Sequence, residues 1–348
     1  MFFASDNSGP VAPAIMAAMA DANSGHSMAY GNDPWMEKAQ AEIREVFEAP
    51  EAAVYLVSTG TAANALALST LTSPFQAIYC SPLAHIVEDE CNAPEFFSGG
   101  ARMSPVGNSV KINPDALRDV IAGQAQGDVH CTQRGPLSIT QVTERGTVYT
   151  LDEIRALTRI ARDFDLPTHL DGARFANAQV ALGCTPADMT WRAGIDAVSF
   201  GGTKNGCMGV EAVIFFDPAH AWQFELRRKR AGHLVSKHRY LAAQMLGYLQ
   251  KDLWLTLAKT SNAKGAALAE GLATIPDASL AHPVDANMLF LTLPRALHVK
   301  LQAAGARYAV MGDLTTGADD DALMCRLVCD WSISDDAIDQ FLTLARAG

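Results

Sequence analysis

The sequence predicts an α/β fold in which a mostly parallel central sheet is flanked by helices. Short apolar segments alternate with amphipathic or alanine-rich segments through about residue 216, a pattern typical of parallel sheets. Three apolar segments end in small or polar residues, at Ser58, Asp171 and Lys204. Ligands of such folds bind beyond the carboxyl ends of the strands, so these residues predict a binding site there.

The pattern becomes mixed after Pro276, with apolar segments at 288–293 and 323–329, a helix after Pro294 and a final helix from about Asp335. This mixture predicts a smaller α+β domain. We therefore expect an N-terminal arm over 1–15, a large domain over 16–247 and a small domain over 248–348. Two long helices, 238–257 and 257–272, are expected where the two domains join.

Composition excludes several classes of protein. The chain has 348 residues, of which 49% are hydrophobic and 19% charged, and a net charge of −11. An acidic balance argues against nucleic acid as a partner. No apolar run reaches about 18 residues, so we expect no membrane span. The start lacks the features of a signal peptide, and the seven cysteines form no C-x-x-C pair, which favours a reduced, cytoplasmic protein without a zinc site.

The segment 196–206 contains the first candidate functional residue. A short buried strand is predicted up to Phe200, and Thr203 and Lys204 follow between glycines. Glycines allow a sharp turn and a close approach to a ligand. A lysine amine that is desolvated there has a lowered pKa and can form a Schiff base with a carbonyl. The alternative is a turn that happens to contain a lysine.

The segment 166–174 contains the second candidate functional residue, Asp171. It predicts a short strand ending at Asp171, which Gly172 and Arg174 follow. A lysine and a carboxylate at neighbouring strand ends suit pyridoxal 5'-phosphate (PLP), whose aldehyde needs an amine and whose pyridinium nitrogen needs an acid. A helix cap is the alternative role for Asp171.

A third turn, at 58–61, predicts an anion site. Residues 52–57 predict a buried strand, and an alanine- and leucine-rich helix begins near Thr61. Backbone N–H groups at such a helix start attract a phosphate, here at Gly60 and Thr61. The turn lacks the Gly-Lys-Ser/Thr of a Walker loop. Many α/β units turn in this way without holding a ligand.

Other segments complete the predicted large domain. Strands are expected at 77–80, 101–103 and 137–142, and helices at 13–20, 35–47, from about Pro114, and from Thr150 to about Phe164, the last with a capping box. His85 stands before a predicted helix with several acidic residues, and by itself it predicts only a solvated loop residue. The basic residues of 227–230 and 237–239 predict a solvated face, a helix C-terminus, or a contribution to a phosphate site or a partner subunit's site.

Taken together, these segments resemble the low-specificity L-threonine aldolases, a family of PLP enzymes that includes phenylserine and allo-threonine aldolases. The resemblance runs nearly end to end and is carried by Ser5-Asp6, Tyr30-Gly-Asn-Asp-Pro34, Thr59-Gly-Thr-Ala-Ala-Asn64, His85, His169-Leu-Asp-Gly-Ala-Arg174, Thr203-Lys204, Asp285-Ala-Asn-Met-Leu-Phe290 and Arg326-Leu-Val328. It implies the fold-type-I architecture of the aspartate aminotransferases, which agrees with the α/β prediction.

The resemblance also implies residue roles. Lys204 is expected to hold the cofactor as a Schiff base, Asp171 to pair with its ring nitrogen, and His85 to stack on its ring. Phosphate is assigned to Gly60, Thr61 and Thr203. The substrate carboxylate is assigned to Arg326, helped by Ser5. Arg174 is expected near the cofactor's phenolic oxygen or the substrate carboxylate, and Tyr30 is expected to contact the substrate. A guanidinium suits a carboxylate because it binds both oxygens.

The chain departs from the family at one position. Many relatives have a histidine near the substrate hydroxyl, in a Glu-Asn-Thr-His run, and Glu144 stands there in this sequence, within Thr140–Arg145. The base that accepts the β-hydroxyl proton is therefore His85, Glu144 or a water between them. His85 has the ordinary pKa better suited to neutral pH.

The function implied by the resemblance is cleavage of threonine, allo-threonine or phenylserine between Cα and Cβ, which yields glycine and an aldehyde. The alternatives are another PLP reaction, such as β-elimination or racemisation, and a non-catalytic PLP carrier. Related folds build each site from two subunits, so a homodimer or homotetramer is expected.

Overall fold

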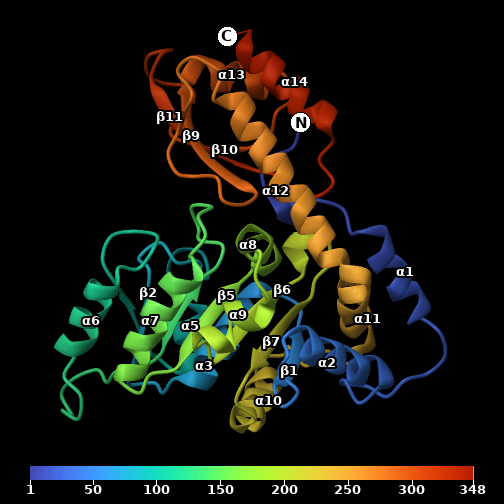
Figure 1. Cartoon of the computed structure of the whole chain (residues 1–348), viewed down its shortest axis with the longest axis vertical. Helices are drawn as coiled ribbons and strands as arrows, with labels where there is room; N and C mark the ends of the chain where they lie inside the picture. Colours follow the sequence, from blue (N-terminus) through green and yellow to red (C-terminus); the bar gives the residue numbers. More distant parts are fainter. Residues whose placement is uncertain (348) are drawn as a thin grey trace.

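The computed structural model describes residues 1–347 and contains two β-sheets, each with its own hydrophobic core. Figure 1 shows the smaller C-terminal sheet above the larger one, with the long helix α12 (Leu253–Leu272) running between them. No helix in the described part of the chain combines the length and apolarity that a membrane crossing requires.

The larger sheet is mostly parallel, as the sequence predicts. Its strands follow the order β1-β7-β6-β5-β4-β2-β3, and only β7 runs against its neighbours. Their bounds are β1 Ala53–Val57, β2 Ala77–Cys80, β3 Arg102–Pro105, β4 Leu137–Thr140, β5 Thr168–Gly172, β6 Ala197–Gly201 and β7 Glu211–Phe215. The carboxyl ends of β1, β4, β5 and β6 therefore meet at one edge.

Helices cover the larger sheet, and strands such as β1, β5 and β6 are therefore buried along their whole length. Their bounds are α1 Pro13–Asp21, α2 Pro34–Val46, α3 Gly60–Leu71, α4 His85–Glu88, α5 Ala93–Ser98, α6 Pro114–Gly123, α7 Leu151–Asp163, α8 Phe175–Leu182, α9 Pro186–Met189 and α10 Ala221–Arg230. The predicted capping box is confirmed: the Thr150 hydroxyl accepts a hydrogen bond from the Glu153 N–H, and the Glu153 carboxylate accepts one from the Thr150 N–H.

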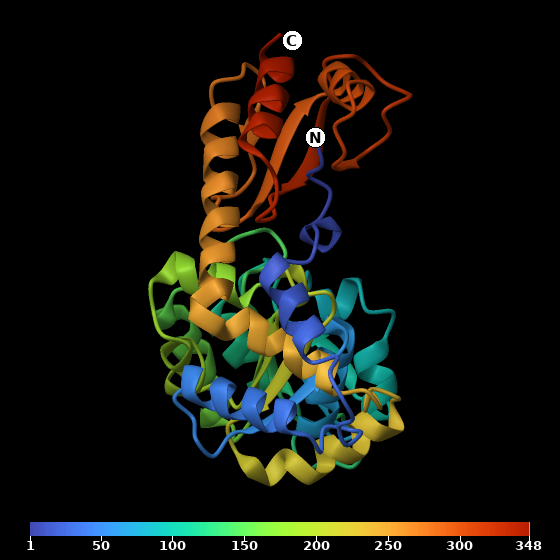
Figure 2. The ribbon, with the colours of Figure 1, turned by 90° about the vertical axis from the view of Figure 1, so that its right-hand side faces the viewer.

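The junction between α11 (Arg239–Leu249) and α12 differs from the prediction. We expected the helix break at Leu257, but the chain turns at Lys251 and Asp252, which both have left-handed backbone angles. No glycine or proline marks this turn in the sequence. In Figure 2, α12 rises from the larger sheet to the smaller one.

The smaller sheet has the order β10-β11-β9-β8 and is antiparallel throughout. Strands β9 (Met288–Pro294) and β11 (Ala322–Val328) and helices α13 (Arg295–Ala303) and α14 (Asp335–Arg346) match predicted segments. The short strands β8 (Ser279–Leu280) and β10 (Ala309–Met311) were not predicted.

The N-terminal arm lies against the smaller sheet, as Figure 1 shows. The Val328 N–H donates a hydrogen bond to the Phe3 carbonyl, and Phe2 forms a bridge with Arg307. A single 3-10 turn, Asp6–Ser8, follows the bridge. The arm thereby carries Asp6 to the edge of the larger sheet, where its side chain is buried.

Candidate active site

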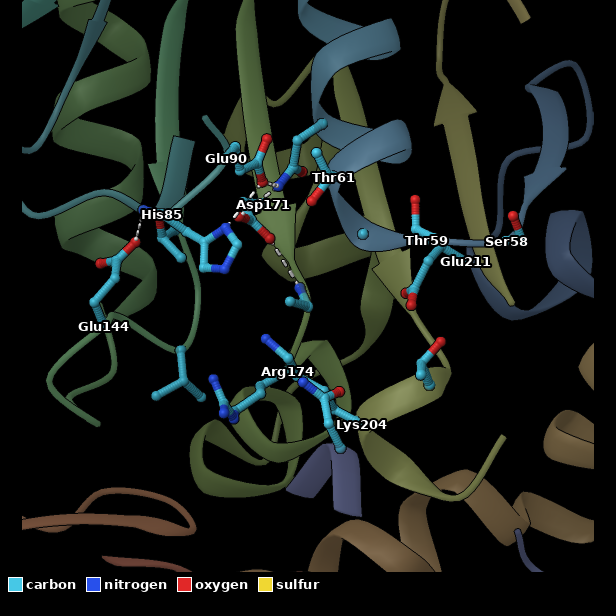
Figure 3. A pocket seen from close by; sticks show the side chains of 17 residues that line it. Ser58, Thr59, Thr61, His85, Glu90, Glu144, Asp171, Arg174, Lys204 and Glu211 are labelled. Atoms are coloured by element: carbon cyan, nitrogen blue, oxygen red, sulfur yellow. Dashed lines mark hydrogen bonds and ion pairs between the residues drawn. The ribbon is translucent and has the colours of Figure 1, made fainter. Parts of the chain in front are cut away.

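A cavity of about 370 Å³ opens at the carboxyl edge of the larger sheet. It is lined by Asn7, Ser58, Thr59, Gly60, Thr61, Asn64, His85, Glu90, Thr140, Val142, Glu144, Asp171, Ala173, Arg174, Thr203, Lys204 and Glu211. Figure 3 shows Glu144, His85 and Glu90 on one side and Ser58, Thr59 and Glu211 on the other, with Asp171 between them. Eight of the eleven predicted site residues therefore share one pocket.

Asp171 is buried at the end of β5 with both carboxylate oxygens hydrogen-bonded. Oδ1 accepts from the Ala173 N–H at 3.0 Å, and Oδ2 accepts from the Asn64 side-chain amide at 2.8 Å. Asn64 lies on α3, which packs against β5. These contacts fix the orientation of a carboxylate that faces the cavity.

His85 begins α4 and is held by a buried glutamate. Its Nδ1 lies 2.9 Å from Oε1 of Glu90, and the same oxygen accepts from the Asn64 amide at 2.9 Å. An ionised carboxylate only accepts hydrogen bonds, so Nδ1 carries the proton and Nε2 keeps a lone pair. The bond to Glu90 raises the pKa of His85, against the opposing effect of burial. Burial raises the pKa of Glu90. We call Asp171, Asn64, Glu90 and His85 the histidine side of the pocket.

Glu144 lies next to His85. Its Oε1 accepts a hydrogen bond of 2.9 Å from the backbone N–H of His85. Burial raises the pKa of the Glu144 carboxyl to about 7, with the Thr140 hydroxyl acting in the opposite direction. A carboxyl with this pKa exchanges protons near neutral pH. Both predicted candidates for the β-hydroxyl base, His85 and Glu144, lie in the pocket.

Lys204 follows β6 in the 3-10 turn Thr203–Asn205. The turn is anchored by the Asn205 amide, which donates to the Tyr248 hydroxyl and to the Trp254 carbonyl, each at 2.8 Å. Burial lowers the pKa of the Lys204 amine, and the Arg174 charge lowers it further. A larger neutral fraction makes the amine a better nucleophile toward an aldehyde.

The opposite side of the pocket presents backbone donors. Thr59 caps α3, with its hydroxyl accepting from the Ala62 N–H at 3.2 Å. Within the described residues, the N–H groups of Gly60 and Thr61 donate no hydrogen bond to the protein. Free N–H groups at the start of a twelve-residue helix form an anion site. We call Ser58–Thr61, Thr203 and Glu211 the threonine side of the pocket.

The two predicted arginines differ in how many of their donors are engaged. Arg174 binds Asp6 through two hydrogen bonds, of 2.6 and 2.9 Å. Burial alone raises the pKa of Asp6, but Arg174 and Lys204 lower it below its ordinary value. Arg326 donates from Nη2 to the Ala4 carbonyl at 3.1 Å, and its Nε has no partner among the described residues. Arg326 therefore has donors left for a ligand.

Three predicted residues do not line this cavity. Ser5 and Arg326 lie beside it, since Arg326 contacts the carbonyl of Ala4 and the charges of Arg174 and Asp6 act on it. Tyr30 lies in a separate surface pocket with His238 and Arg228, where its ring contacts the Lys229 amine at 4.9 Å. The single chain does not bring Tyr30 to the cavity.

The sequence assigned no role to Asp6, Asn64, Glu90 or Glu211, which lie in or beside the cavity in the structure. Asn64 and Asp6 were within the quoted family segments, so the resemblance contained a signal for them. Glu90 stood in an acidic run typical of a solvated helix. Glu211 gave no signal, since a single glutamate in an apolar strand does not show which end of the strand faces a ligand.

Comparisons with known proteins agree with this geometry. A family model described as beta-eliminating lyase matches residues 3–294. A low specificity L-threonine aldolase of Pseudomonas aeruginosa is 42% identical over 99% of this chain and 96% of its own. The solved threonine aldolase of Leishmania major has a TM-score of 0.91 and 27% identity, covering 99% of this chain and 98% of that one.

A more distant structure shares the fold alone. It is a serine palmitoyltransferase from S. paucimobilis with a bound PLP–myriocin aldimine, with a TM-score of 0.68 and 15% identity, covering 100% of this chain and 86% of that one. The predicted fold class is confirmed by these matches. The chain therefore belongs to the beta-eliminating lyase family, among the low-specificity L-threonine aldolases.

Proposed function

We propose that this protein is a PLP-dependent lyase that cleaves β-hydroxy-α-amino acids such as threonine to glycine and an aldehyde. The observation that carries the proposal is the meeting, in one cavity, of an amine with a lowered pKa, a fixed carboxylate and an open anion site. Each of these three groups matches one reactive part of the cofactor.

The residues present fit PLP at three points. The free N–H groups of Gly60 and Thr61, with the Thr203 hydroxyl, would hold the phosphate. Asp171 would hold the ring nitrogen, and Lys204 would bond to the aldehyde. When bound, PLP supplies an electron sink for the pair that is released as the Cα–Cβ bond breaks.

The substrate carboxylate is assigned to Arg326. Its Nε has no partner among the described residues and its side chain is partly buried, so an ion pair there is less screened than at the surface. Arg174 already has two donors bound to Asp6. We therefore assign Arg174 to holding Asp6 and the N-terminal arm beside Lys204. Its remaining N–H groups would be available to the cofactor's phenolic oxygen.

The β-hydroxyl proton is assigned to Nε2 of His85. Glu90 keeps the proton of the ring on Nδ1, which leaves the Nε2 lone pair free to accept another. Glu144 is bound to the backbone of His85 rather than to its ring. Glu144 therefore acts on how the substrate hydroxyl is held, and replaces His85 as the base only if its own proton is lost first.

We further propose a homodimer or homotetramer whose sites are completed by a second copy. Tyr30 is exposed and lies outside the cavity of its own chain, which fits a residue that serves a partner's pocket. Mixing the Tyr30→Phe and Lys204→Ala variants tests this assignment. A shared site regains activity in mixed oligomers, whereas sites confined to one chain regain none.

The test of the proposed function is product analysis with threonine, allo-threonine and phenylserine isomers. A retro-aldol lyase releases glycine and an aldehyde in equal amounts. A β-eliminating enzyme instead releases ammonia and an oxo acid from threonine, and a racemase releases neither. A PLP carrier gives the absorbance of the bound cofactor without any product, so each alternative has its own outcome.

A further inference from the structure

Glu211 is brought to the pocket by the reversed direction of its strand. β7 lies between β1 and β6 and runs against both, with Glu211 paired to Val57 on one side and to Gly201 on the other. The first residue of β7 therefore lies where β1 and β6 end. Those ends lead directly into Ser58–Thr61 and into Thr203, the two halves of the anion site.

The carboxyl of Glu211 is almost fully enclosed there. The residue is 5% exposed, and its Oε2 accepts a hydrogen bond of 3.1 Å from the Gly202 N–H. Figure 3 shows it on the same side of the pocket as Ser58 and Thr59. A carboxylate in this position opposes the function of the site, because the surrounding helix start and N–H groups attract an anion.

Four titratable groups face Glu211 from the elements packed around it. Lys204 favours the ionised carboxylate, and Asp171 disfavours it. Burial raises the pKa of the Cys207 thiol and the Tyr248 hydroxyl well above their ordinary values, so both stay neutral. Burial of Glu211 outweighs the favourable contacts with Thr203, Lys204 and Gly202 and raises its pKa to about 7.

We propose that Glu211 couples the binding of the cofactor's phosphate to the uptake of one proton. The phosphate binds to the protein in which Glu211 is neutral, and the ionised carboxylate competes with it for the threonine side of the pocket. This inference rests on the proposed PLP function and concerns only how the cofactor is bound. It makes cofactor loading dependent on pH through a residue outside the reaction.

The direction of the effect follows from linkage. A bound phosphate repels the carboxylate and raises the pKa of Glu211 further, so the complex holds a proton that the free protein loses above about pH 7. Between the two pKa values, affinity for the phosphate falls about tenfold per pH unit. The titration of Lys204 has the opposite effect on cofactor affinity, which rises with pH because only the neutral amine bonds to the aldehyde.

Comparison of PLP with pyridoxal separates the two effects. Both ligands have the aldehyde and the ring, and only PLP has the phosphate, which is a dianion above about pH 7. The ratio of the pyridoxal Kd to the PLP Kd therefore cancels the titration of Lys204. We expect this ratio to fall about tenfold per pH unit above about pH 7 in the wild-type protein.

The experiment measures both Kd values by cofactor absorbance or fluorescence between about pH 6 and pH 9. In Glu211→Gln the ratio should become independent of pH. Glu144→Gln is the matched control, because it removes a carboxyl of similar pKa on the opposite side of the cavity. In Glu144→Gln the ratio of the pyridoxal Kd to the PLP Kd should fall with pH as it does in the wild-type protein. A flat ratio in the wild-type protein, or an equal fall in Glu211→Gln, overturns the proposal.

Calorimetry of the wild-type protein gives a second test that needs no variant. PLP binding in buffers of different ionisation enthalpy should show about one more proton taken up at pH 8 than pyridoxal binding shows. Equal proton uptake for the two ligands overturns the proposal while leaving the PLP function intact. If neither ligand binds, the proposed function itself fails.

Discussion

The two sides of the pocket differ in whether their functional groups are held by hydrogen bonds to other side chains. On the histidine side, Asp171, Asn64, Glu90 and His85 form one chain of hydrogen bonds of 2.8 to 2.9 Å. On the threonine side, the N–H groups of Gly60 and Thr61 lack acceptors within the described protein. The first side is oriented before a ligand arrives, whereas the second is completed by one. Substitutions on the two sides should therefore fail in different ways.

Lys204 lies between the two sides, and its loss should have the largest effect. Lys204→Ala removes the only covalent link proposed for the cofactor, so turnover should fall by more than about a thousandfold. Borohydride reduction followed by mass spectrometry should find PLP attached to the wild-type chain and not to the variant. Lys259→Ala, at an exposed position of α12, is the control and should keep both its turnover and its covalently attached PLP. Normal turnover in Lys204→Ala would contradict the assignment.

On the histidine side, Asp171→Asn should lower kcat by at least about a hundredfold, equal to about two pKa units of lost interaction with the ring nitrogen. KM should change less, because the ion pair acts on the electron sink and not on substrate binding. PLP should still bind through the threonine side. Steady-state kinetics provides the measurement, with Asp163→Asn at the exposed Arg118 pair as control. Unchanged kcat would remove Asp171 from the mechanism.

His85→Asn should lower kcat by about a hundredfold, within the range of general base catalysis. Glu144→Gln should lower it less and should mainly change the ratio of threo to erythro substrates cleaved, because Glu144 contacts the backbone of His85 and not its ring. Kinetics on the isomers of threonine and phenylserine distinguishes the two residues. If Glu144→Gln is the slower variant and loses its acidic limb, Glu144 is the base.

Glu90→Gln tests whether Glu90 sets the pKa of His85 as well as its orientation. The base must be unprotonated, so activity falls as pH drops through the pKa of His85, which Glu90 raises. A neutral glutamine removes this effect, and the acidic limb of kcat/KM should move to lower pH. The accompanying loss at neutral pH should be about fivefold, the value of one hydrogen bond of about 1 kcal/mol. If the acidic limb of kcat/KM does not move, a group other than His85 produces it.

On the threonine side, Thr59→Ala should have the smallest effect. Removing a helix cap costs about 1 kcal/mol of unfolding free energy. Ser334→Ala is a matched control, because Ser334 caps α14 with the same 3.2 Å bond to the third N–H of its helix and lies outside the cavity. Both variants should lose similar stability in denaturant titrations, and only Thr59→Ala should weaken PLP binding. Equal PLP affinity in the two would show that the cap has no part in the site.

The sequence was sufficient to predict the strand ends, and with them most of the pocket. Lys204, Asp171 and Gly60 each follow a short apolar run, and the parallel arrangement brings such ends to one edge. Glu211 could not be predicted, because it depends on the direction of β7, which periodicity does not reveal. The partnership of Arg174 with Asp6 depends on the path of the N-terminal arm past the small sheet, a contact between distant parts of the chain.

Helix α12 links the two hydrophobic cores. Its N-terminal half contributes Trp254, Leu257 and Ala258 to the core of the larger sheet, and its C-terminal half contributes Leu268 and Leu272 to that of the smaller one. Its twenty residues span about 30 Å without a break. Neither core can melt without exposing apolar surface at one end of the same helix. The two parts of the chain should therefore unfold as one cooperative unit, with a single calorimetric transition.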